Sequence, residues 1–131
     1  AHVGKHGNKM AEDVNAQTAV TEAAIALDQL KLVLFRNYAR IVDAAKTGIQ
    51  LSLEERLLQR AQASYVPKLT GYHVNEMMRA CAASGTFKSN PIERVFRDIH
   101  QGRTHIANNT DAYVRAYGSH VLGIPNQEPF V

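Results

Sequence analysis

The sequence predicts an all-α helical bundle of three long helices and one short helix. Its longest uninterrupted segment, residues 11–46, contains no Gly or Pro and is rich in Ala, Leu, Gln and Glu, which are good helix formers. Apolar residues recur in it at three- and four-residue steps, the period of an amphipathic helix. Strand patterns are almost absent. With 131 residues, 45% of them hydrophobic, the chain is long enough for one domain with a modest core.

The first predicted helix covers residues 11–46 and is followed by Gly48, a residue type that often ends helices. One apolar stripe runs along it, formed by Val20, Ala24, Leu27, Leu30, Leu34, Tyr38 and Ile41. Leu32, Val33 and Phe35 extend the apolar surface beyond that face. A helix that is hydrophobic on more than one side usually packs between neighbours or against another subunit. We therefore expect this helix to take part in an interface.

The second predicted helix begins at a capping box formed by Ser52 and Glu55. In this motif the serine oxygen accepts a hydrogen bond from the backbone of the glutamate, whose carboxylate reaches back to the serine N–H. The apolar periodicity continues past Pro67 to Ala83. Because the pattern resumes directly after the proline, we expect a kink at that position and not an end of the helix.

The third predicted helix follows a break at residues 84–88. Asn90 is a favourable N-cap, Pro91 suits the first turn, and Glu93 occupies the capping-box position. The pattern predicts that this helix continues to residues 107–109.

A short fourth helix is predicted from Ala112 to Leu122, immediately before a glycine. The domain organisation then reads as a flexible lead-in over residues 1–10, a helical bundle over 11–123 and a C-terminal tail over 124–131, which contains two prolines.

Composition excludes several classes of protein. The net charge of +3 is spread over interspersed acids and bases, which disfavours a nucleic-acid-binding protein. No apolar run approaches the length of a membrane span. The single cysteine, Cys81, rules out a disulfide framework and fits a reducing, cytoplasmic compartment. His2 and His6 lie among glycines in the lead-in, so we expect no metal site there.

Two stripes of side chains are predicted along the third helix. The apolar one, taken as the core face, consists of Ile92, Val95, Phe96, Ile99, Gly102 and Ile106. The polar one has spacings of four, three, four and three and consists of Arg94, Asp98, Gln101, His105 and Asn108. It has two interpretations: a solvated flank with an Arg94–Asp98 salt bridge, or a face directed at a reactive partner. Gly102 and the histidine favour the second, since a mid-helix glycine often marks close approach and imidazole suits proton transfer.

A helical metal site is not predicted from this segment. His100 and His105 are five residues apart, which separates them by about 140° around an ideal helix. Helical zinc ligands are four residues apart, on one face.

The segment also resembles a known family. Gly85, the run Asn90–Asp98 and the triplet Arg103–His105 resemble the C-terminal helical domain of the acyl-CoA dehydrogenase fold. They are most similar to the branch of flavin-dependent monooxygenases that are oxygenase components of two-component systems, such as 4-hydroxyphenylacetate hydroxylases and dibenzothiophene monooxygenase. The resemblance implies a bundle that lacks its first helix here and lacks the preceding domains of such enzymes.

The resemblance implies a function as well. The expected protein is a reduced-flavin-dependent monooxygenase that hydroxylates a small aromatic or related substrate with O2 through a C4a-hydroperoxyflavin. Reduced FMN or FAD would come from a separate flavin reductase, no metal would be involved, and the oxygenase would form a homo-tetramer.

The resemblance also assigns site residues. His105 would lie near the flavin ring and the substrate phenol, where it would stabilise the hydroperoxide or help to deprotonate the phenol. Asn108 occupies the position of the catalytic glutamate of common acyl-CoA dehydrogenases, and an amide cannot act as that base. Ser84, Gly85 and Thr86 correspond to a turn that approaches flavin, often that of a neighbouring subunit.

Several alternatives stay open at this point. The turn at residues 84–86 can be an ordinary helix–helix connection. Arg97 and Asp98 are expected to be structural, as a buried or interface ion pair. The chain can also be part of an acyl-CoA dehydrogenase-like FAD oxidoreductase, or a helical oligomerisation module without chemistry of its own.

Overall fold

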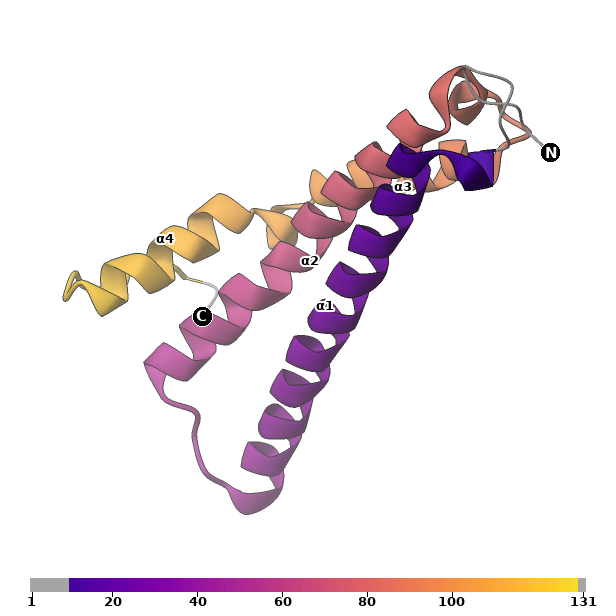
Figure 1. The fold of residues 1–131 in the computed structure, drawn as a ribbon. Helices are drawn as coiled ribbons and strands as arrows, with labels where there is room; N and C mark the ends of the chain where they lie inside the picture. The colour runs from indigo at the N-terminus through magenta and orange to yellow at the C-terminus, as the bar shows by residue number, and fades with distance from the viewer. Residues whose placement is uncertain (1–9, 130–131) are drawn as a thin grey trace.

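The computed structural model describes residues 10–129 of the chain, and every regular element in that range is a helix (Figure 1). The predicted all-α class is confirmed. The predicted lead-in, with His2 and His6, lies outside the described residues apart from its last position. The elements are η1 (Met10–Glu12), α1 (Val14–Thr47), α2 (Leu53–Ala80), η2 (Ala82–Thr86), α3 (Pro91–Arg103), η3 (Ile106–Asn108) and α4 (Thr110–Val121), where η denotes a short 3-10 helix.

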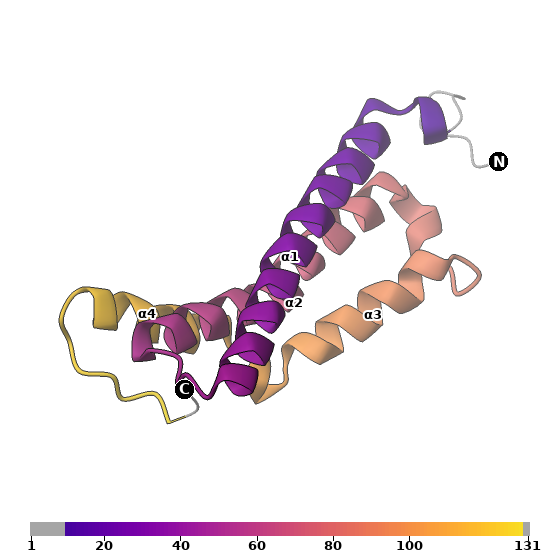
Figure 2. The same cartoon turned by 90° about the horizontal axis from the view of Figure 1, so that it is seen from below.

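Helix α2 is the centre of the bundle because it contacts α1, α3 and α4. Figure 1 shows α1 and α2 as antiparallel neighbours, joined by a loop at one end. Figure 2 shows α3 running back from η2 toward the middle of the bundle, where the chain turns through η3 into α4. The N-terminal half of α2 therefore faces α4 and its C-terminal half faces α3. The η3 turn lies at the junction.

The ends of α1 agree with the prediction to within a few residues. Asp13 is the N-cap, and its carboxylate oxygen accepts hydrogen bonds from the backbone of Asn15 at 2.9 Å and Ala16 at 3.0 Å. Gly48 ends the helix with a φ of +70°, a conformation that costs other residues energy. The broad apolar surface is also present: Leu32 is 65% exposed and Phe35 is 66% exposed.

The predicted capping box begins α2. The Glu55 N–H donates to Ser52 Oγ at 3.1 Å, and the Ser52 N–H donates to Glu55 Oε2 at 2.9 Å. Arg40 of α1 donates from Nε to the same carboxylate at 3.0 Å, which ties α1 to the start of α2. Two hydrogen bonds lower the pKa of Glu55: the larger effect comes from the backbone N–H of Ser52 and the next from the side chain of Arg40.

Glu55→Gln should make the stability of the chain less sensitive to acid. A lowered folded-state pKa gives stabilisation that is present above the ordinary glutamate pKa of about 4.3 and is lost as pH falls through the folded value. Glutamine keeps an oxygen for Ser52 but removes the charge that faces Arg40. Urea unfolding over a pH series should show a shallower loss below about pH 4. The exposed neighbour Glu54→Gln is the control, and equal slopes for both variants would contradict the assignment.

Helix α2 continues through Pro67, as predicted, but it ends at Ala80 and not at Ala83. The cause is local: Ala82 has a φ of +49°, which turns the chain out of the helix and into η2. The Ser84 hydroxyl then donates to the Cys81 carbonyl at 2.6 Å, which satisfies one of the last acceptors of the helix.

Helix α3 begins as predicted and ends early. Asn90 caps it, since its side-chain oxygen accepts from the Ile92 N–H at 3.1 Å. The capping-box role of Glu93 is wrong, because Glu93 accepts from Arg97 Nε at 2.7 Å and does not bond the cap. The helix ends at Arg103, several residues before the predicted 107–109. His105 is extended there, with φ −66° and ψ 136°.

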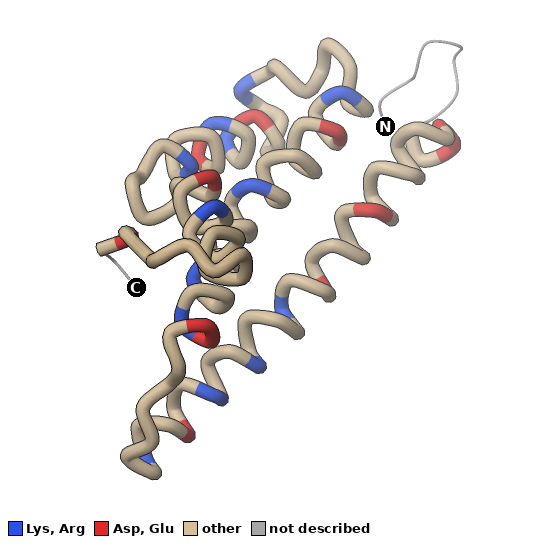
Figure 3. Tube along the Cα trace, turned by 90° about the vertical axis from the view of Figure 1, so that its left-hand side faces the viewer, with Lys and Arg blue, Asp and Glu red and all other residues tan. Residues whose placement is uncertain are grey.

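The buried core is small and rich in alanine. Its large members are Leu57 (1% exposed), Val74 and Tyr113, and four buried alanines allow the helices to approach closely. The predicted core face of α3 is wrong in part, because no residue of that helix is buried and Ile106, beyond its end, is 68% exposed. Figure 3 shows acidic and basic positions interspersed along the helices, as the sequence indicated.

Candidate functional site

A polar hollow of about 540 Å³ lies where α3, η3 and α4 meet the middle of α2. The two candidate catalytic residues, His105 and Asn108, both line it. The two residues do lie together, as predicted, but a turn brings them together and not the continuous helix that the prediction assumed. The remaining lining residues are Lys68, Arg103, Thr104, Ile106, Asn109, Thr110 and Asp111.

The His105 side chain has a defined hydrogen-bonding state. Its Nδ1 accepts a hydrogen bond from the Ala107 backbone N–H at 3.1 Å, so the ring caps the η3 turn. An acceptor nitrogen carries no proton, and the neutral ring therefore has its proton on Nε2. His105 is exposed and Nε2 makes no hydrogen bond to the described residues. The His105 ring thus offers one N–H donor to an incoming group.

Asn108 has a structural bond that the sequence did not indicate. Its Nδ2 donates to the Gly102 carbonyl at 2.7 Å, which caps the C-terminal end of α3. Gly102 itself meets open space, so the close approach predicted at this glycine does not occur within the described part of the chain. The second N–H of the Asn108 amide is not used by this bond.

Two cations of the hollow were missed by sequence reasoning. Lys68 of α2 lies 4.0 Å from Asp111, and both side chains are well exposed, so this ion pair is weak. Arg103 lies across Gly71 of α2: a Cβ at Gly71 would be 2.9 Å from both Arg103 Cδ and Nη1. Gly71 is buried in the middle of a helix, where glycine costs stability relative to alanine. That unfavourable glycine was the available signal for a close contact on α2.

Gly71→Ala should move Arg103 without unfolding the protein. The added methyl group displaces the flexible end of the arginine, while alanine improves helix propensity by roughly 0.5–1 kcal/mol. The Arg103 Nε–H NMR signal should shift, and urea unfolding should show less than about 1 kcal/mol of destabilisation. Gly118→Ala on α4 is the matched control, because a Cβ there meets open space. An unshifted Arg103 signal would contradict the contact.

The other notable side chains of α3 lie outside the hollow. His100 Nε2 lies 2.9 Å from Asn75 Oδ1 of α2, and its ring packs against Phe96 at 4.5 Å between centroids. The predicted Arg94–Asp98 salt bridge is present at 3.4 Å. The expected buried ion pair of Arg97 and Asp98 is wrong: Arg97 bonds Glu93, Asp98 bonds Arg94, and the side chains of Arg97 and Asp98 are both well exposed. A role of these two residues at a subunit interface stays a prediction. These exposed pairs contribute little stability.

The turn predicted to bind flavin is η2, and both of its hydroxyl groups donate to nearby backbone carbonyls. Ser84 donates to Cys81 as described above, and Thr86 Oγ1 donates to the Ala83 carbonyl at 2.8 Å. Gly85 is buried against α2, where a Cβ would be 2.9 Å from Met78 Sδ and 3.1 Å from the Met78 carbonyl oxygen. Packing therefore explains this glycine within the chain.

The chain does not bring η2 and His105 into one pocket. The 13 residues of α3 lie between them, a length of about 20 Å. If both segments contact flavin, they contact different ends of it or the flavins of different subunits.

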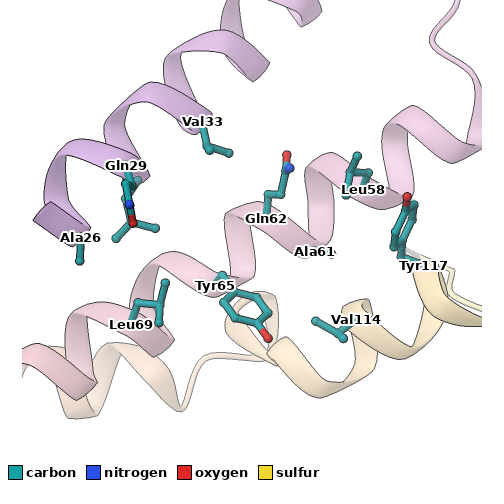
Figure 4. A pocket seen from close by; sticks show the side chains of 11 residues that line it. Ala26, Gln29, Val33, Leu58, Ala61, Gln62, Tyr65, Leu69, Val114 and Tyr117 are labelled. Atoms are coloured by element: carbon teal, nitrogen blue, oxygen red, sulfur yellow. The ribbon is translucent and has the colours of Figure 1, made fainter.

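A second hollow, of about 380 Å³, lies between α1, α2 and α4 and is lined by uncharged side chains. Figure 4 shows Val33 and Gln29 of α1 facing Leu58, Gln62 and Tyr65 of α2. Its lining contains no carboxylate, imidazole or amine, and its only acid–base groups are the phenols of Tyr65 and Tyr117, so it is a mainly apolar surface.

Two further findings concern only the described residues. They contain no group of three or more His, Cys, Asp and Glu side chains arranged to hold a metal ion. Within the same range, no helix combines the length and hydrophobicity that crossing a membrane would require.

The chain is similar in sequence to oxygenase components of flavin-dependent enzymes. The chain is 30% identical over 121 residues to the FADH(2)-dependent resorcinol hydroxylase, oxygenase component, of Rhizobium sp., covering 89% of this chain and 30% of that protein. It is 32% identical over 128 residues to the flavin-dependent monooxygenase, oxygenase subunit HsaA, of Mycobacterium tuberculosis, covering 95% of this chain and 32% of that protein.

A solved structure has the same fold. XiaF from Streptomyces sp., in complex with FADH2 and glycerol, superposes with a TM-score of 0.88 over 100% of this chain and 33% of that chain, at 20% identity. The chain thus spans about a third of the length of these relatives. The family model described as "Acyl-CoA dehydrogenase, C-terminal domain" matches residues 2–110. The chain belongs to the acyl-CoA dehydrogenase C-terminal domain family.

Proposed function

We propose that this chain is the C-terminal domain of the oxygenase component of a flavin-dependent monooxygenase. The observation that carries the proposal is a free imidazole N–H at His105, in a polar hollow, in a chain that resembles such oxygenases over most of its length. The substrate would be a small aromatic compound and the co-substrate O2. The whole reaction requires the remaining two thirds of a protein of this kind.

His105 would act as a hydrogen-bond donor through Nε2. Sequence reasoning left two roles open, stabilisation of a C4a-hydroperoxyflavin and deprotonation of the substrate phenol. In the neutral tautomer described here Nε2 carries a proton, so it can donate to an oxygen but cannot accept the phenol proton at the same atom. The geometry therefore favours the first role. Asn108 would provide a second donor beside it.

The cofactor would be reduced FMN or FAD, delivered by a separate flavin reductase. When bound, the reduced flavin would supply the electrons that activate O2. Lys68 and Arg103 outnumber the single carboxylate of the hollow, Asp111, and this excess of positive charge suits an anionic substrate oxygen, such as a phenolate. Ser84, Gly85 and Thr86 would approach the flavin of a neighbouring subunit, with Thr86 as the exposed member of the turn.

The test uses the complete protein that carries this chain. Reduced FMN or FAD is added without oxygen, O2 is then admitted, and the absorbance is followed. A transient C4a-hydroperoxyflavin spectrum, followed by hydroxylation of a phenolic substrate, is the expected result. Reduction of bound FAD by an acyl-CoA would instead support the dehydrogenase alternative, which Asn108 disfavours because it replaces the required carboxylate.

The exposed apolar face of α1 supports a second proposal, on the oligomeric state of the protein. Phe35 and Leu32 are about two-thirds exposed, and many other apolar side chains of the helix share this exposure. A large amount of exposed apolar surface on one helix is typical of an interface. We propose that α1 packs against a second copy of the chain in a homo-tetramer. Light scattering should give the mass of the oligomer, and a monomer at micromolar concentration would contradict this proposal.

A further inference from the structure

Arg60 of α2 contacts the segment that carries the candidate site. Its Nη2 donates to the Ala107 carbonyl at 2.8 Å, across 47 positions of sequence. Its guanidinium carbon lies 4.0 Å from the centroid of the Tyr113 ring of α4, a residue that is 3% exposed. Arg60 therefore joins three elements, α2, η3 and α4, at one point.

The charge of Arg60 is not matched by an acid among the described residues, since no ion pair of this arginine occurs there. Its cation is stabilised by the face of Tyr113, which fixes the plane of the guanidinium. A guanidinium held in this way directs its N–H groups along defined lines. One of these lines ends at Ala107.

Ala107 connects Arg60 to His105. Its carbonyl accepts from Arg60 and its N–H donates to His105 Nδ1 at 3.1 Å. Both backbone polar groups of one residue are thus occupied, one by a charged donor from α2 and the other by the imidazole. A displacement of Ala107 would remove the bond that keeps the His105 proton on Nε2.

We propose that Arg60 is a positioning residue that fixes the orientation and tautomer of the His105 imidazole through Ala107. This inference rests on the proposed function for its consequence in activity. The structural effect on His105 does not depend on the proposed function, because it can be measured in the 131-residue chain itself.

Removal of Arg60 should leave the bundle folded. Thr110 Oγ1, which is buried, donates to the Ser64 carbonyl at 2.8 Å and anchors the start of α4 to α2 independently of Arg60. Arg60→Met keeps the aliphatic stem against Tyr113 and removes the donors. Arg60→Lys keeps a charge and a donor. Arg36→Met is the matched control, because Arg36 bonds Asn37 and Gln62 and does not contact η3.

The first experiment uses 15N NMR of the full chain at a pH where His105 is neutral. In the wild type, Nδ1 should resonate as an unprotonated acceptor and Nε2 as a protonated nitrogen. Arg60→Met should move both signals toward the tautomer mixture of free histidine and raise amide exchange at Ala107 about 10-fold. Arg60→Lys should lie between, and Arg36→Met should match the wild type. Unchanged His105 signals and Ala107 exchange in Arg60→Met would overturn the proposal.

The second experiment measures product formed per O2 consumed in the complete protein. Arg60→Met should lower this yield about 10-fold with little change in KM, because the donor is misplaced and not removed. Combined with His105→Ala it should cause no further loss, since both variants act on the same group. Additive losses would overturn the proposal. Failure of the wild type to hydroxylate would instead reject the proposed function, and the NMR result would still decide the role of Arg60.

Discussion

Replacing His105 by alanine should lower the yield of hydroxylated product per O2 consumed by about 10²–10³-fold in the complete protein, if the proposed function is correct. The variant removes the Nε2–H of His105, which has no hydrogen-bond partner among the described residues. Removal of a single oriented donor has effects of this size where the site is closed to water, as we expect once the remaining domains of the complete protein cover the hollow. Product and hydrogen peroxide should be quantified together, because O2 consumed without hydroxylation should appear as peroxide.

Two variants separate a chemical role of His105 from a structural one. His105→Gln retains a side-chain N–H and should recover part of the yield. His100→Ala removes the other imidazole of the segment, which bonds Asn75 outside the hollow, and should leave the yield unchanged. The loss of the single capping bond to Ala107 should cost only about 0.5–1.5 kcal/mol of stability. Wild-type yield in His105→Ala would exclude the donor role.

Local signals predicted most of the helix ends. The Ser52 and Glu55 pair, the Asn90 cap and the glycine at position 48 act through bonds and dihedral angles within a few residues of themselves. Such features can be recognised from sequence because nothing distant is needed to form them. The same reasoning explains why α1 and the starts of α2 and α3 agree with the prediction.

The end of α3 could not be predicted because distant residues determine it. The sequence after Arg103 continues a helical pattern, and the chain departs from it where α2 provides alternative bonds. Arg60 bonds Ala107, and the Ser64 carbonyl accepts from Thr110. No pattern along residues 91–110 contains this information. The expected capping-box role of Glu93 failed for a different, local reason: Arg97, four residues further along the same helix, bonds its carboxylate.

The sequence predicted two residues of the candidate site, but the helical spacing that grouped them is not what brings them together. His105 and Asn108 share a hollow, but the helical stripe that grouped them does not extend beyond Arg103. Lys68 enters from α2, more than thirty positions earlier in the sequence, so spacing along the third helix could not include it. The role of Arg103 was indicated only by the unfavourable glycine at position 71, which makes sense once the arginine is placed against it.

Leu57→Ala should destabilise the chain by about 2–5 kcal/mol, measured by urea unfolding of the 131-residue chain. Leu57 is 1% exposed and lies on α2, the helix that contacts the other three. Most of the buried hydrophobic residues are alanines, so few other large side chains can move to fill the cavity. Because the free energy of unfolding of a domain is only about 5–15 kcal/mol, the loss expected at this single residue is a large fraction of the total stability. Leu122→Ala, at a position that is 80% exposed, should change stability by less than about 0.5 kcal/mol. Equal effects of the two substitutions would mean that α2 is not the centre of the core.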